Sequence, residues 1–215
     1  YTGSAITLTT ATSGTGYTLS GYSQTNANES PGYTITATLA SGYRWNDNST
    51  GTKTFVCKLY KATPTITLSP TSVTVVAGKT VTFTEKANVA GKFNNTSGTT
   101  SVATISPAEN TGVAANTEKT ETVTGVAFGT STITVTFTPT DTDNYNTITA
   151  TSPSGAAKTY TARVGATVTF EKNGATSIGS NSLNCYPAAG QASCTVEAPT
   201  ITREGFTITG WQGQA

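Results

Sequence analysis

The chain has 215 residues, of which only 11% are charged, with 12 Lys and Arg against 11 Asp and Glu. It contains no block of basic residues, which argues against an electrostatic surface for nucleic acid or anionic lipid. It also contains no histidine, the commonest general base and metal ligand, so the composition argues against an enzyme. We therefore expect no catalytic residue, no cofactor and no metal ion.

About a quarter of the residues are Thr, whose branched Cβ suits a half-exposed pleated strand and disfavours a helix. Apolar and hydroxyl residues alternate with a period of two over long stretches, which places the apolar side chains on one face of each strand. No segment has convincing helical periodicity, and residues 110–120 are expected to form a loop. No apolar run approaches the roughly 20 residues of a membrane helix. The sequence predicts an all-β fold.

Residues 1–63 contain extended segments separated by clusters of Gly, Asn and Ser, which are typical of turns. The phrases YTGSAITL, PGYTITATL and SGYRWND resemble a bacterial surface immunoglobulin-like repeat. The opening strand of that repeat is missing, so the resemblance implies a module that is clipped at its N-terminus. Phe55, Cys57 and Leu59 are expected to share an inner face, with Cys57 as a buried free thiol.

Residues 64–164 alternate most regularly. Their predicted inner-face residues are Ile66, Leu68, Val73, Val75, Val81, Phe83, Ile133, Val135 and Phe137. The paired phrases AGKTVTF and VTGVAFGTSTITV resemble the bacterial immunoglobulin-like domain of group 2 type, which occurs as tandem modules in surface proteins. The resemblance implies one β-sandwich in this segment, and we expect a final hairpin around residues 152–155.

Two polar groups in this segment have alternative interpretations. The residues 141–144 (DTDN) look like the start of a calcium loop, but no acidic residue follows until Glu171, so we interpret them as a polar turn. Surface modules of this kind sometimes carry an intramolecular crosslink, for which Lys79, Lys86 and Glu85 are the candidates. We expect Glu85 to face outward on its strand, which argues against a crosslink.

Residues 165–215 contain the phrases TVTFEKNG, APT and REGFTITGW, which are similar to the internalin-type B repeat, a small β-grasp-like module. Relatives continue past the final Gly-Trp pair, so this copy is expected to be cut or shorter. Cys185 and Cys194 either form a disulfide or are two small unpaired apolar residues, and we predict the disulfide. Closing a loop of about ten residues contributes roughly 2–3 kcal/mol, which matters for a module this small.

Four aromatic residues of the first segment, Tyr22, Tyr33, Tyr43 and Trp45, are weak candidates for a sugar-stacking platform. Aromatic residues at alternating positions more often pack on a sheet face, so the two interpretations stay open. The short connection at residues 61–64 contains a proline, which predicts a semi-rigid joint between the first two modules.

The resemblances imply a non-catalytic, structural and adhesive segment of a bacterial cell-surface or secreted protein, in which tandem β-modules form an extracellular stalk. The partners expected are neighbouring modules of the same longer chain. Three alternatives remain: a module that binds a glycan or a host surface protein, an accessory region of a secreted enzyme, and a filament subunit that self-associates by strand exchange. No nucleic-acid partner and no membrane insertion are expected for this segment.

Overall fold

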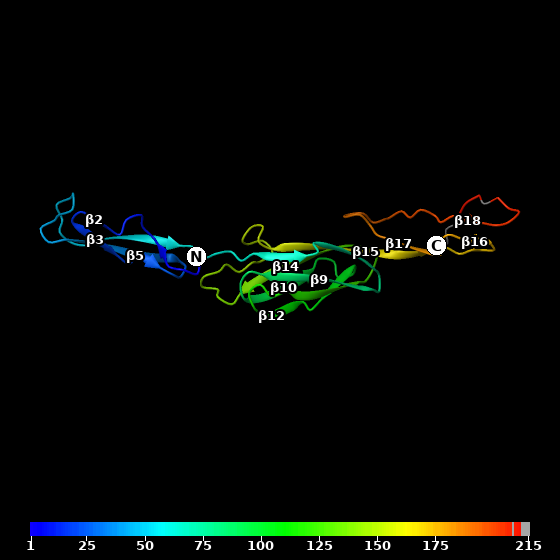
Figure 1. The fold of residues 1–215 in the computed structure, drawn as a ribbon, viewed down its shortest axis with the longest axis horizontal. Coiled ribbons are helices and arrows are strands. Elements are labelled where there is room, and N and C mark those ends of the chain that lie inside the picture. The colour runs from blue at the N-terminus through cyan, green and yellow to red at the C-terminus, as the bar shows by residue number, and fades with distance from the viewer. Residues whose placement is uncertain (208, 212–215) are drawn as a thin grey trace.

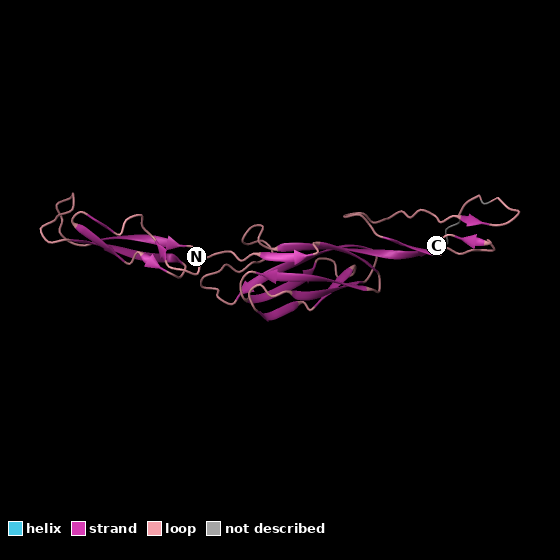
Figure 2. Cartoon of the chain, viewed as in Figure 1, coloured by secondary structure: helices cyan, strands magenta, loops and turns pink. Residues whose placement is uncertain are grey.

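The computed structural model describes residues 1–207 and 209–211, and these residues form β-strands and no helix. The all-β prediction is confirmed. The part of the chain that the structure describes has no helix of the length and apolarity that a membrane crossing requires. The strands form three groups that follow one another along one long axis (Figure 1). A loop segment joins the first group to the second, and the long strand β15 runs from the second group into the third (Figure 2).

The first group contains a four-stranded antiparallel sheet in the order β2-β3-β5-β6 and a separate β1–β4 pair. Its strands are β1 (Ile6–Thr7), β2 (Ser13–Gly14), β3 (Tyr17–Ser20), β4 (Ser23–Gln24), β5 (Asn28–Leu39) and β6 (Lys53–Leu59). Leu59 is buried, but Phe55 is 42% exposed and Cys57 is only partly buried. The expected inner face of β6 is therefore wrong at Phe55, because β6 is the outermost strand and burial decreases along it toward the loop.

The middle group contains two facing sheets. Its strands are β7 (Ile66–Ser69), β8 (Ser72–Val76), β9 (Thr80–Ala87), β10 (Gly91–Ser97), β11 (Ala103–Ser106), β12 (Glu109–Val113), β13 (Lys119–Gly125), β14 (Gly129–Pro139) and β15 (Lys158–Thr169). One sheet has the order β11-β13-β9-β7, and the other has the order β12-β10-β14-β15 with β8 parallel to β15. The expected loop at 110–120 is wrong at both of its ends. Residues 110–113 belong to β12, which pairs with β10, and residues 119–120 belong to β13, which pairs with β9.

The core of the middle group lies between the two sheets. All of the predicted inner-face residues are buried except Val81, which is partly buried. Phe83 of one sheet stacks on Tyr160 of the other, with ring centroids 4.1 Å apart. Phe93 packs at 4.8 Å against Phe137, its cross-strand neighbour in the same sheet. Since each fully buried side chain of this kind stabilises the fold by roughly 1.5–3 kcal/mol, alternation alone accounts for a large apolar core.

The connection from β14 to β15 differs from the hairpin expected around residues 152–155. Strands β14 and β15 are antiparallel neighbours, but the chain leaves the sheet after Pro139 and returns only at Lys158. Between them the segment is tied to β14 by an isolated bridge between Phe137 and Ile148. The strand expected before Ser152 is absent because the segment turns toward the first group.

The third group begins on a strand of the second. β15 pairs with β14 and β8 up to Val164 and Gly165, and then continues to pair with β17 (Ser182–Cys185). The short strands β16 (Ser177–Ile178) and β18 (Ile201–Thr202) form a further pair. Trp211 packs edge-on against Phe170 at 5.1 Å. The residues after Trp211, where the expected shortening falls, lie outside the described residues.

Candidate functional site

The loop between β5 and β6, residues 40–52, surrounds a hollow of about 480 Å³ at the outer end of the first group. Aromatic and charged side chains line this hollow together. They include Tyr17, Tyr43, Arg44, Trp45, Asp47 and Lys53. Such a combination of aromatic faces with a few convergent polar groups is typical of small-ligand sites.

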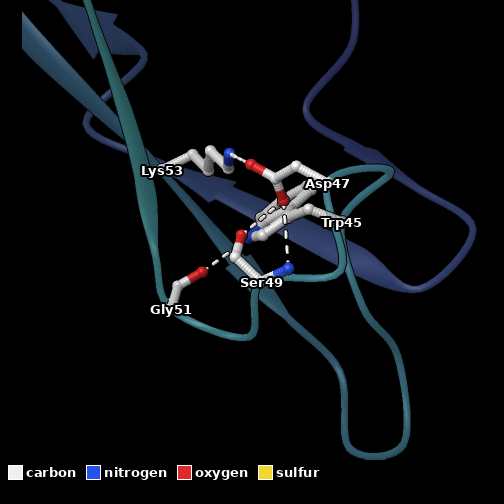
Figure 3. Close-up of polar contacts among 5 residues, drawn as sticks. All are labelled: Trp45, Asp47, Ser49, Gly51 and Lys53. Atoms are coloured by element: carbon white, nitrogen blue, oxygen red, sulfur yellow. Dashed lines mark hydrogen bonds and ion pairs between the residues drawn. The ribbon is translucent and has the colours of Figure 1, made fainter.

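Hydrogen bonds within the loop hold its shape (Figure 3). Asp47 accepts hydrogen bonds from the backbone N–H of Ser49 at 3.0 Å and from its hydroxyl at 2.6 Å, and it also pairs with Lys53. The hydrogen bonds from Lys53 and Ser49 hold the pKa of the Asp47 carboxyl well below its usual range. The indole Nε1 of Trp45 donates to the carbonyl of Gly51 at 2.5 Å. The loop is therefore ordered before any ligand binds.

Glycine allows the aromatic rings to gather at this hollow. The ring of Tyr43 lies directly over Gly16, which has a φ of 83° and no Cβ to block the contact. The rings of Tyr17 and Trp45 are tilted against one another with centroids 6.1 Å apart. Tyr43 is 49% exposed, so one aromatic face remains open to solvent.

The structure brings together only two of the four aromatic candidates. Tyr43 and Trp45 line the hollow, whereas Tyr33 lies six residues before the end of β5, about 20 Å along the strand, and its hydroxyl donates to the carbonyl of Asn26. Tyr22 lies between β3 and β4 and does not line the hollow. Tyr17 also lines the hollow but was not predicted from the sequence, although the repeated Gly-Tyr pairs of the segment were a usable signal.

The polar turn at residues 141–146 forms the joint between the first two groups. Asn144 holds it: its side chain donates to Asp141 at 2.9 Å and accepts from the backbone N–H of Ala27 at 2.7 Å. The backbone of Ala62 is bonded on both sides, to the carbonyl of Asn144 at 2.9 Å and to the N–H of Asn146 at 2.8 Å. The carboxylate of Asp141 is thus engaged in organising the turn.

A polar cluster that was not predicted from the sequence lies inside the sandwich. Glu85 of β9 and Glu121 of β13 are both fully buried, and they face Asn95 of β10 and Asn110 of β12 in the opposite sheet. The expectation that Glu85 faces outward is wrong. Residues two apart on a strand share a face, so Glu85 lies on the same side as the core residue Phe83. The alternation of inward and outward side chains along the strand was therefore the signal that could have identified the cluster.

The amide groups of the two asparagines bridge the carboxyl groups. Asn110 donates to Oε1 of Glu85 at 3.0 Å and to Oε1 of Glu121, and Asn95 donates to Oε1 of Glu85 at 3.3 Å. Burial raises the pKa of Glu85 to about 7 and also raises the pKa of Glu121. The cluster therefore favours a protonated carboxyl group inside a core that is mostly apolar.

Cys185 and Cys194 form the predicted disulfide, with their Cα atoms 5.9 Å apart. Within the loop that the disulfide closes, the carbonyl of Pro187 accepts a hydrogen bond from Nε of Arg163 on β15 at 2.6 Å. Cys57 is a free thiol, and its Sγ lies 3.7 Å from the carbonyl oxygen of Leu8. The disulfide thus closes a loop that is anchored on the strand shared by the second and third groups.

No protein-family model and no curated protein matches the chain. Among solved structures, it is similar to domains 4 and 5 of the S-layer protein SbsC, with 23% identity, a TM-score of 0.34, and coverage of 73% of this chain and 80% of that one. It is also similar to the fragment rSbsC(31-844), with 25% identity, a TM-score of 0.36, and coverage of 76% and 22%. For SbsC domains 1–6 the identity is 21%, the TM-score is 0.36, and the match covers 97% of this chain and 28% of that one. All these TM-scores lie below 0.5, and we draw no functional conclusion from them.

Proposed function

We propose that this chain is a non-catalytic, structural segment of a bacterial cell-surface or secreted protein, and that it forms part of an extracellular stalk of tandem β-modules. The proposed modules are residues 1–63, 64–164 and 165–215. SbsC is by its name an S-layer protein, and the proposal puts this chain in the same broad class because of its own architecture, not because of that likeness.

One observation carries the proposal: neither joint contains a free linker. At the first joint, Lys61 donates from its Nζ to the carbonyl of Thr142 at 2.8 Å, and Asn146 donates to Oγ1 of Thr63 at 3.1 Å. At the second joint, β15 passes from one sheet into the next without a break. Modules joined in this way hold a fixed spacing, which is what a stalk requires.

The strand order of the middle module supports an immunoglobulin-like assignment. Strands β7, β9, β13 and β11 correspond to the A, B, E and D strands of that fold, and β10, β14 and β15 to C, F and G. Strand β12 is an addition beside β10. The group 2 type of this module and the β-grasp-like assignment of residues 165–215 rest on the sequence phrases alone.

Small-angle X-ray scattering of the intact chain tests the stalk. A compact domain of this length has a radius of gyration of about 17 Å, and an extended rod has a clearly larger value. A variant with four Gly-Ser residues inserted between Ala62 and Thr63 is the matched comparison, because it keeps the modules and loosens one joint. The proposal fails if the wild type has the compact value, or if the insertion leaves the distribution of interatomic distances unchanged.

A second candidate function is glycan binding at the β5–β6 loop, and the ordered aromatic hollow favours it. Tyr43 presents an open ring face beside Arg44 and Asp47, which suits the stacking and hydrogen bonding of a sugar. A glycan array probed with the intact chain should give signals that Tyr43→Ala removes. Tyr60→Ala is the control, because Tyr60 is 63% exposed and lies outside the hollow. Equal loss in both variants, or no signal with the wild type, would refute this function.

A third candidate is self-association by strand exchange, which the outer edge of β6 favours. In the described part of the chain β6 ends its sheet, and Phe55 and Val56 are exposed on it. Edges of this kind can accept a strand from another chain. Light scattering should then show a mass that increases with concentration, and Val56→Lys should abolish the increase. A constant monomer mass at high concentration would rule it out.

A further inference from the structure

The polar cluster inside the middle sandwich has buried oxygen atoms that lack partners. The oxygens concerned are Oε2 of Glu85, Oε2 of Glu121 and Oδ1 of Asn95. Glu85 and Glu121 have no exposed surface, and Asn95 is 4% exposed. When both carboxyl groups are ionised all three of these atoms are acceptors, and leaving a buried acceptor without a partner is costly. A group that satisfies all three atoms of the ionised cluster carries positive charge or donates hydrogen.

The charged side chains of the surrounding strands do not supply that positive charge. Among the described residues, the ion pairs link Lys86 to Glu118, Lys92 to Glu109 and Lys53 to Asp47, and none reaches Glu85 or Glu121. Lys119 lies directly opposite Glu85 in the strand register but forms no ion pair with it. The two carboxyl groups thus face one another without a cationic partner from the chain.

We propose that Glu85, Glu121, Asn95 and Asn110 form a binding site for a calcium ion inside the sandwich. The two carboxyl groups offer four oxygens and, when ionised, two negative charges, which balance one divalent cation. Asn95 offers a further oxygen that has no partner, and a half-turn of the Asn110 amide presents its oxygen in place of the nitrogen. These six oxygens match the coordination of Ca²⁺, which takes six to eight oxygen ligands in flexible geometry.

The strands place the four ligands suitably for such a site. Glu85 and Glu121 are diagonal neighbours on one inner face, since Glu85 is opposite Lys119 and Glu121 is opposite Phe83. Asn110 is only partly buried and lies on β12, the outermost strand of its sheet, which gives an ion a short route from solvent. An oxygen-only ligand set favours Ca²⁺ over Zn²⁺ or Cu²⁺, which prefer nitrogen and sulfur. Mg²⁺ is disfavoured because it keeps several of its waters.

Calorimetry of the intact chain at pH 8, in EDTA and in excess CaCl₂, tests the site. We expect Ca²⁺ to raise the melting temperature of the sandwich by at least about 5 °C, since a ligand that binds only the folded state stabilises it. Glu121→Gln should remove this increase. Asp143→Asn is the matched control, because it removes an acidic side chain from the exposed joint loop and should leave the increase intact.

Equilibrium dialysis with ⁴⁵Ca²⁺ keeps the test valid if Glu121→Gln fails to fold. The wild type and Asp143→Asn should each bind one ion per chain, and Asn95→Leu should bind at least tenfold more weakly. The proposal is overturned if the wild type binds no Ca²⁺, if its melting temperature is the same in EDTA and CaCl₂, or if Asp143→Asn abolishes binding. The last result would assign the ion to the joint loop.

Discussion

Glu85→Gln should remove a large part of the pH dependence of the stability of the middle sandwich. The pKa of Glu85 is raised from 4.5 to about 7, mainly by burial. Between these values the unfolded chain releases a proton that the folded chain retains, so the contribution of Glu85 to stability is fully present below pH 4.5 and is lost as the pH rises to about 7. At 1.36 kcal/mol per pKa unit, the loss is about 3 kcal/mol for Glu85. For a domain of this size that corresponds to roughly 10–20 °C in melting temperature.

Glutamine preserves the contacts while removing the charge. Its carbonyl oxygen can accept the hydrogen bonds that Asn95 and Asn110 donate to Glu85, and its amide can donate to an acceptor that now lacks a partner. The variant should therefore be at least as stable as the wild type at pH 8, and similar to it at pH 5. The exposed residue Glu118 provides the control, since Glu118→Gln removes one charge without any buried contact.

Calorimetry of the intact chain in EDTA, at pH 5, 6.5 and 8, measures the effect without metal binding. The transition of the sandwich is identified by Val135→Ala, which removes buried methyl groups from that core alone. The reasoning is refuted if the wild type melts at the same temperature at pH 5 and pH 8. It is also refuted if Glu85→Gln shows the same pH dependence as the wild type and Glu118→Gln.

Three further changes address the joints and the disulfide. Asn144→Ala removes hydrogen bonds that link the first two modules, so scattering should show a broader distribution of interatomic distances, and an unchanged distribution would count against the joint. Cys194→Ser opens the disulfide loop and should lower the stability of the third module by roughly 2–3 kcal/mol. Hydrogen exchange of the β17 amides measures this loss, and equal protection in the variant and the wild type would contradict it. Gly165→Val should make the backbone amides of β17 exchange faster while those of β14 stay protected, because a Cβ at position 165 collides with Tyr186 and the Cys185 carbonyl. Unchanged protection of both strands would show that β15 tolerates the added side chain.

Strand alternation predicted the sandwich well because its core depends on a local rule. The period of two places Ile133, Val135 and Phe137 on the inner face of their strand, whichever strands it pairs with. All three are fully buried. The first group was predicted less well, since the exposure of Phe55 depends on β6 being an edge strand, which is a property of the sheet and not of the segment. The long β14–β15 connection depends in the same way on contacts with residues more than eighty positions away.

The candidate sites depended still more on contacts that the sequence does not show. Tyr17 lies beside Tyr43 and Trp45 only because β3 pairs with β5, and no local sequence pattern specifies β5 as the partner of β3. The burial of Glu85 could have been predicted from the period of two, because Glu85 lies on the same face of its strand as Phe83. Its amide partners Asn95 and Asn110 belong to the opposite sheet, so only the folded sandwich brings them together.

The parallel pairing of β8 with β15 has a mechanical consequence. Strand β8 lies near the start of the sandwich and β15 leaves it at the other end, so tension on the two ends of the chain pulls these strands in opposite directions along their length. The hydrogen bonds between them lie across the direction of pull and share the load, so they must rupture together instead of one after another. A shear arrangement of this kind resists stretching far better than strands that are peeled apart.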